Sequence, residues 1–107
     1  MPTTARGQIL KLTELVHYQA GSVVSRIIVK GETGNVTLFA FDQGQELSEH
    51  TTPFDALLHL VDGTAAIEIS GKPFHLEAGD AIVMPANEPH AVKAVERFKM
   101  LLTMIRR

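Results

Sequence analysis

The amino-acid sequence predicts an all-β domain, folded as a sandwich or barrel of short antiparallel strands. Apolar and polar residues alternate with a period of two through most of the chain after Ser22, which is typical of strands that bury one face. Turn signals rich in glycine, proline and asparagine recur roughly every 8–12 residues, the spacing expected of sandwiches and barrels. No stretch shows a long helical period.

The composition is that of an ordinary globular domain. With 107 residues, 45% of them hydrophobic and 21% charged, the chain can bury a core as one domain, residues 1–107. A net charge of −2 gives no field that attracts nucleic acid or an anionic membrane, so we expect neither partner. The absence of cysteine excludes disulfides and thiolate metal ligands. Without an apolar leader or an apolar run of ~20 residues, we expect a cytoplasmic protein.

The N-terminal part of the chain has no strong pattern. Residues 1–7 are small and polar and are expected to form a flexible tail. In residues 8–18 the apolar positions suit a short helix, yet the segment could equally pair as an edge strand. Both alternatives stay open from the sequence.

Two alternating segments, 23–30 and 35–41, predict a β-hairpin. The loop Gly31–Gly34 begins and ends with glycine, which suits a turn that needs positive φ. Side chains of the second segment divide between two faces, with Val36, Leu38 and Ala40 on one and Thr37, Phe39 and Phe41 on the other. Both faces are largely apolar, which predicts a strand covered on two sides.

Further strands follow in the second half of the chain. Residues 64–70 and 73–77 alternate around Gly71-Lys72, where a leading glycine predicts a type II′ turn. Short strands are also expected at 81–84 and at the closing segment 98–105, about nine or ten in all with those described below.

Two segments each supply one histidine. His50 lies in residues 44–63, GQELSEHTTPFDALLHLVDG. His90 lies in residues 79–94, GDAIVMPANEPHAVKA. Each segment reads as alternating strands bounded by glycine turns. Periodicity alone does not bring the two histidines together.

Alternation predicts which neighbours share a face with these histidines. If the strand is regular, Thr52 lies on the face of His50, and Glu46 and Ser48 precede them on that face.

The first segment resembles the first signature motif of the cupin superfamily. That motif has a glycine, a His-x-His pair, a glutamate and a second glycine at fixed spacing. Gly44, His50 and Gly63 fit it, whereas Thr52 stands at the second histidine and Ala56 at the glutamate.

The second segment is similar to the second cupin motif. Gly79, Pro85 and His90 match its glycine, proline and histidine, while Asn87 stands for another glycine and Ala94 for an asparagine. The replacement at Asn87 is mild, since asparagine tolerates the left-handed conformation.

The resemblance implies an antiparallel double-stranded β-helix, the jelly-roll barrel of cupins, with a pocket inside it. In metal-binding cupins the four motif positions hold one Fe, Mn, Ni, Zn or Cu ion, and His50 and His90 are the two that this chain keeps. Whether one divalent transition metal binds, or none, stays open, because two imidazoles alone make a weak site. Small family members commonly pair as homodimers, so we expect a homodimer.

Two hypotheses for function follow. The first is a binding module, with a sensing or accessory role, that takes a small polar or anionic molecule in a pocket lined by His50, Thr52, Met84, His90 and Phe41. The second is a metal-dependent enzyme, such as a dioxygenase or isomerase, in which the two histidines hold the ion.

Other histidines are expected to point out of the barrel. If Ala56 faces inward, as the resemblance implies, then alternation turns His59 outward. His75 should face outward for the same reason if its apolar neighbours are in the core.

Overall fold

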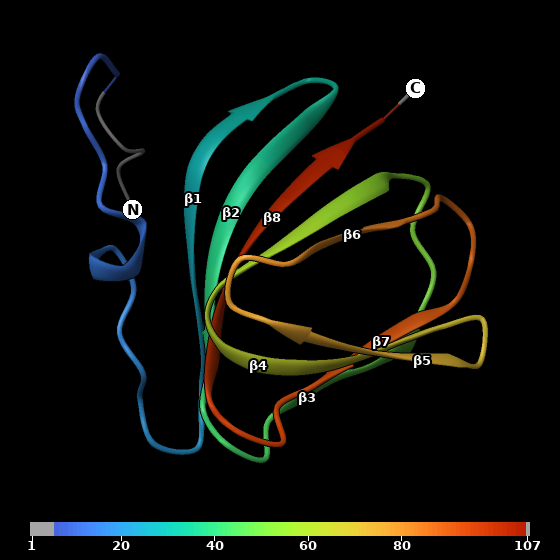
Figure 1. Ribbon diagram of the computed structural model, residues 1–107. Coiled ribbons are helices and arrows are strands. Elements are labelled where there is room, and N and C mark those ends of the chain that lie inside the picture. Colours follow the sequence, from blue (N-terminus) through green and yellow to red (C-terminus); the bar gives the residue numbers. More distant parts are fainter. Residues whose placement is uncertain (1–5, 107) are drawn as a thin grey trace.

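The structure, a computed structural model, describes residues 6–106 and forms one curled antiparallel sheet (Figure 1). Its elements are η1 (Leu12–Glu14), a single 3-10 turn, and the strands β1 (Val23–Gly31), β2 (Gly34–Phe41), β3 (Glu46–His50), β4 (Asp55–Ile69), β5 (Lys72–Glu77), β6 (Ala81–Met84), β7 (His90–Lys93) and β8 (Phe98–Ile105). The predicted all-β fold is confirmed. Of the tail predicted at residues 1–7, residues 1–5 lie outside the described residues.

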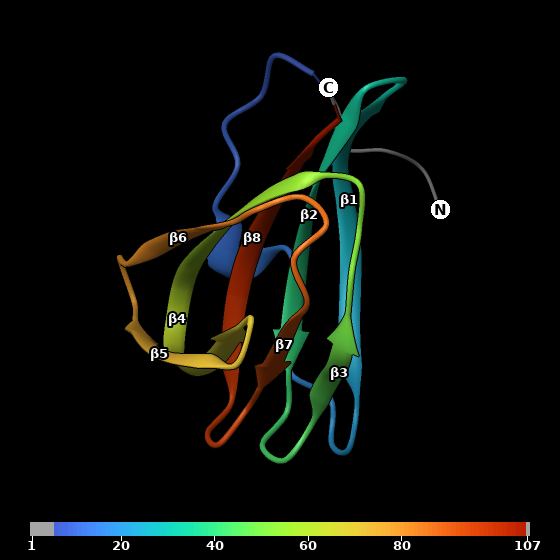
Figure 2. The ribbon, with the colours of Figure 1, turned by 90° about the vertical axis from the view of Figure 1, so that its right-hand side faces the viewer.

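The sheet folds back on itself through its longest strand, β4. Neighbouring strands follow the order β1-β2-β8-β4-β7-β3, and β5 and β6 also pair with β4. The first half of β4 pairs with β8 and β6, and its second half with β5 and β7. The strands that pair with the first half, together with β1 and β2, are called the first layer below. Those that pair with the second half, together with β3, form the second layer, which faces the first across the core (Figures 1 and 2).

Gly63 allows β4 to pass from one layer to the other without a break. Its φ is 78°, and a Cβ atom at this position would lie 2.2 Å from the carbonyl oxygen of Arg97. Only glycine combines that backbone conformation with that close approach. Because the chain bends here instead of ending a strand, residues 6–106 form eight strands, and for this part of the chain the prediction of nine or ten is wrong.

The hydrophobic core lies between the two layers. Phe41 of β2 and Phe98 of β8 are fully buried and stack with their ring centroids 4.6 Å apart. Buried apolar residues from both layers complete this core, namely Ala56, Leu58, Leu60, Ala65, Ile67, Leu76, Met84, Val92, Ala94, Met100 and Leu102. The burial of Ala56 confirms that its face of β4 points inward, as the resemblance implied.

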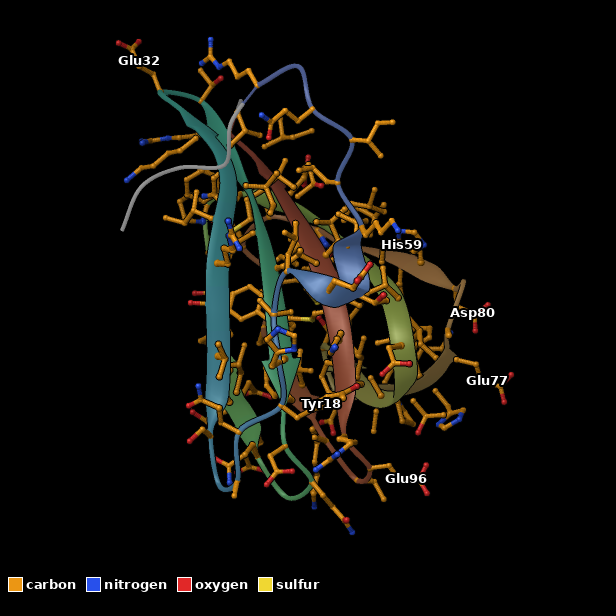
Figure 3. The ribbon with its side chains drawn as sticks, turned by 90° about the vertical axis from the view of Figure 1, so that its left-hand side faces the viewer. Tyr18, Glu32, His59, Glu77, Asp80 and Glu96 are labelled. Carbon is orange, nitrogen blue, oxygen red and sulfur yellow. The ribbon has the colours of Figure 1, made fainter. Side chains whose placement is uncertain are left out.

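A second, smaller core covers the outer face of the first layer. Residues 11–18, called the N-terminal strap, place Val16 against Leu38 and Ala40 of β2. Figure 3 shows the strap lying across the sheet on this side. The prediction that β2 is covered on both faces is confirmed. Residues 8–18 form neither the edge strand nor the short helix considered from the sequence, because η1 is a 3-10 turn of three residues and the rest of the segment is irregular.

Cationic side chains of the sheet hold the strap in place. The Nζ of Lys99 donates to the carbonyl oxygen of Thr13 at 2.7 Å and lies 4.9 Å from the centre of the Tyr18 ring. The Tyr18 hydroxyl donates to Asp62, and burial followed by this carboxylate raises the pKa of Tyr18 above its usual value. These contacts tie both ends of the strap to β4 and β8.

Two turns differ in detail from the sequence predictions. Gly31 and Gly34 pair with each other as strand residues, so the β1–β2 loop holds only Glu32 and Thr33. Ile69 pairs with Lys72, which places the β4–β5 turn at Ser70-Gly71, one residue earlier than predicted. Both turn residues have positive φ, 49° and 80°, as in a type I′ turn and not the predicted type II′ turn.

Some apolar residues of β1 remain exposed. Val23, Ile27 and Val29, on the edge strand of the first layer, are 37%, 40% and 45% exposed. The expected homodimer stays a prediction, which a solution mass of twice 11.7 kDa would support. Within residues 6–106, no helix is long and apolar enough to cross a membrane.

Candidate functional site

His50 and His90 lie directly opposite each other on neighbouring strands. They are register partners at the ends of β3 and β7 in the second layer (Figure 2). Their ring centroids are 4.4 Å apart, and the ring planes are inclined at 67°. The fold thus brings together two imidazoles that are separated by forty positions in the sequence.

A β-bulge places His50 on the same face of β3 as Leu47. Leu47 pairs with Val92 and His50 with His90, so β3 uses one residue more than β7 between these two pairs. The extra residue puts Leu47 and His50 on the same face, although their odd spacing would separate them in a regular strand. The prediction that Glu46 and Ser48 share the face of His50 is therefore wrong, because it assumed a regular strand.

Two neighbouring loops fix the ends of the histidine strands. The N–H of Asn87 donates to the carbonyl oxygen of Thr52 at 2.7 Å, and the N–H of Ala86 donates to Asp55 Oδ1 at 2.9 Å. Asn87 has a φ of 66°, so asparagine adopts the left-handed conformation anticipated for it. These bonds link the chain just after His50 to the chain just before His90.

Backbone carbonyls set the tautomer of both rings. His50 Nδ1 lies 2.8 Å from the carbonyl oxygen of Ser48, and His90 Nδ1 lies 3.3 Å from that of Glu88. A carbonyl oxygen can only accept, so in each neutral ring the proton resides on Nδ1 and the Nε2 atom carries a lone pair. In both cases the carbonyl lies two residues before the histidine, a spacing that no side-chain motif signals.

The two histidines differ in burial. His90 is 5% exposed, whereas His50 lies at the exposed edge of the layer. Burial lowers the pKa of His90 below 6.5, and the neighbouring His50 lowers it further. His90 is therefore neutral at pH 7 and forms the inner wall of the site, with His50 at its outer side.

The other predicted pocket residues lie in different surroundings. The Thr52 hydroxyl is 3.3 Å from both the backbone nitrogen and the carbonyl oxygen of Phe54, so it is engaged within its own loop. Met84 is 2% exposed, and Phe41 is fully buried against Phe98. Contact of these three residues with a ligand stays a prediction.

The remaining strand histidines face away from the core, as expected. His59 lies on the outer side of β4 (Figure 3), between the inward-facing Leu58 and Leu60. His75 is exposed between Phe74, which packs on the core, and the buried Leu76.

The donor set does not fit a resident metal ion. Among residues 6–106, no group of three or more histidine, cysteine, aspartate or glutamate side chains is placed to hold one. Stable protein metal sites use three or four such ligands. His50 and His90 supply only two ligands. Thr52 and Ala56 stand at the positions of the other two metal ligands of the first cupin motif.

Comparisons with known proteins identify the family of the fold. A family model described as the cupin domain matches residues 37–105. A conserved protein of unknown function from Streptococcus pyogenes is similar with a TM-score of 0.91 and 36% identity, over 96% of this chain and 90% of that one. A cupin superfamily protein from Desulfitobacterium hafniense is similar with a TM-score of 0.90 and 26% identity, over 97% and 95% of the two chains.

A longer relative contains the same unit. A cupin 2 conserved barrel domain protein from Leptotrichia buccalis has a TM-score of 0.88 and 41% identity, over 91% of this chain and 47% of that one. A search of curated proteins found no match. The fold is the antiparallel double-stranded β-helix, and the chain belongs to the cupin superfamily.

Proposed function

We propose that this cupin binds a small molecule at the paired imidazoles of His50 and His90. The observation that carries the proposal is the engagement of both Nδ1 atoms by backbone carbonyls, which leaves both Nε2 atoms free. Within the described chain, Arg26 Nε is the one buried side-chain nitrogen or oxygen without a hydrogen-bond partner. Because His90 Nε2 has no protein partner either, this atom is in contact with solvent and has a lone pair to offer to a ligand.

The chemistry of the two rings selects the class of ligand. A neutral imidazole offers a lone pair at Nε2 and accepts a hydrogen bond there. The low pKa of His90 keeps its ring in this neutral form at pH 7. The pair therefore favours molecules with hydrogen-bond donors, such as hydroxyl or amide groups, over the anions that the sequence left open. A ligand with two adjacent donors suits two acceptor rings whose centroids are 4.4 Å apart.

The alternative of a metal-dependent enzyme requires ligands from outside the protein. With only two imidazoles, a bound ion would depend on water or on the substrate for its other ligands. Elemental analysis of protein purified without chelator or nickel affinity resin separates the two hypotheses. A content below about 0.1 metal ion per chain contradicts the enzyme, since metal held by a functional site should survive purification.

A matched pair of probes tests the binding proposal. Catechol carries two adjacent hydroxyl donors, and its dimethyl ether, veratrole, has the same ring without them. We expect catechol, added to chelator-treated protein, to shift the histidine side-chain NMR signals of His50 and His90, while veratrole shifts neither. His50→Ala and His90→Gln should each weaken catechol binding about tenfold or more. This is roughly the effect of removing one hydrogen bond between a catechol hydroxyl and an imidazole in a partly buried site.

His75→Ala is the matched control for these variants, because this histidine is exposed and faces away from the core. It should leave catechol binding unchanged. Equal responses to catechol and veratrole, or equal losses in all three variants, would contradict the proposal. Catechol binding that appears only after Zn²⁺ is added would support the metal alternative instead.

A further inference from the structure

A groove runs across the outer face of the second layer, on the opposite side of this layer from the two imidazoles. It has a volume of about 360 Å³ and crosses β5, β4, β7 and β3. Ala66 and Ala91 lie in it and alternate with the buried Ile67 and Val92, so their side chains point away from the core. These two alanines are diagonal neighbours on the adjacent strands β4 and β7, and their small side chains leave a shallow apolar floor.

Carboxylates without partners surround this floor. Glu46, Glu49 and Glu68 line the groove and are exposed, and Lys93 is the one cation that lines it. None of the three carboxylates makes a hydrogen bond or an ion pair within residues 6–106. The groove therefore combines an apolar floor with an excess of negative charge that the protein itself does not neutralise.

The pairing of the strands explains why Glu68 stays unneutralised. Its register partners are Pro73 on one side and Ala91 on the other. Neither side chain has a donor, whereas a lysine or arginine at either position would lie within reach of the carboxylate. The Glu68 carboxylate is therefore exposed to solvent and open to a cationic group of a partner molecule.

The dimensions of the groove indicate the kind of partner. Four strands spaced ~4.8 Å apart span about 14 Å, the length of roughly four residues of extended chain. In such a chain, alternate residues project to the same side and are about 7 Å apart. Glu46 faces Lys93 across the β3–β7 pair, so Glu49 and Glu68 are the groove carboxylates without a cationic register partner. Two long basic side chains at alternate positions would lay their aliphatic stems on Ala66 and Ala91 and direct their charged heads to Glu49 and Glu68.

We propose that this groove binds an extended segment of a partner protein that carries two basic residues separated by one residue. Charge complementarity and the apolar floor select this occupant. The groove is formed without either imidazole, so the proposal does not depend on ligand binding at His50 and His90.

Binding of short labelled peptides to the full chain tests the proposal. The probe is fluorescein-labelled Ala-Arg-Ser-Arg-Ala-amide, and its control is the same peptide with glutamine in place of arginine. We expect the arginine peptide to bind more tightly, with an affinity that falls as salt is raised from about 50 to 300 mM. The double variant Glu49→Gln/Glu68→Gln should weaken its binding about fivefold or more, as expected when two partly exposed ion pairs are removed.

The matched control is Glu32→Gln/Glu77→Gln, which removes the same charge from exposed positions outside the groove (Figure 3). It should leave the affinity within twofold. Equal weakening by both double variants would show attraction by net charge only and would overturn the proposal. Binding of free arginine amide as tight as that of the peptide would assign the groove to a small cation and would also overturn it.

Discussion

Gly63→Ala is expected to lower the free energy of unfolding by about 2–5 kcal/mol, the sum of about 1–2 for a left-handed alanine and about 1–3 for overpacking. The added methyl group would sit 2.2 Å from the carbonyl oxygen of Arg97, and the backbone has a φ of 78°. Since this oxygen belongs to the backbone, relief requires a shift of β4 against β8. Chemical denaturation of the two proteins measures the difference.

Gly71→Ala separates the two contributions. Gly71 has nearly the same φ, 80°, but no atom lies within 4 Å of an added Cβ. The Gly71→Ala substitution should lower the free energy of unfolding by only about 1–2 kcal/mol, the cost of placing alanine in the left-handed conformation. Equal losses at the two glycines would show that the close approach of β4 to β8 contributes nothing.

Phe98→Ala is expected to cost about 3–5 kcal/mol, the usual loss for a large aromatic residue in a packed core. The ring is fully buried and stacks on Phe41 with an interplanar angle of 15°. Such a loss is a large part of the total stability of a domain of this size, about 5–15 kcal/mol. Thermal or chemical unfolding of the purified variant checks it.

Phe74→Ala provides the comparison for that variant. Phe74 only packs against the edge of the core, is half-buried, and has Lys72 Nζ 5.4 Å from its ring centre. The loss should be clearly smaller than at Phe98. If the two variants were equally stable, the stacked pair would not be the centre of the core.

Much of the fold could be predicted because it depends on local patterns. Alternation marked the strands, and the motif glycines Gly44 and Gly79 marked turns, where both have positive φ. Alternation also oriented His59 and His75, because β4 and β5 keep a regular period around them.

Features that depend on tertiary contacts could not be predicted from local patterns. The bulge between Leu47 and His50 inserts one residue into β3, and no glycine or other turn residue in this segment indicates it. The continuity of β4 through Gly63 is similar, since a glycine with positive φ ends a strand as readily as it bends one. The strap over β2 takes its position from Lys99 and Tyr18, which are far from each other in the sequence.

The candidate site was predictable in its residues but not in its chemistry. The two motifs identified His50 and His90, and resemblance to a family placed them together. The tautomers, by contrast, depend on the carbonyl groups of Ser48 and Glu88. Every residue has such a carbonyl, so its direction follows only from the folded backbone.

Long-range ¹H–¹⁵N NMR of the histidine side chains, recorded between about pH 8 and pH 5, tests the central claim most directly. The account predicts that both neutral rings carry the proton on Nδ1 and that His90 becomes protonated only below its ordinary pKa of 6.5. His50→Ala should raise the pKa of His90, because one repulsive neighbour is removed. A proton on Nε2 of either neutral ring would contradict the account. So would a His90 pKa at or above 6.5 that is unchanged in the His50→Ala variant.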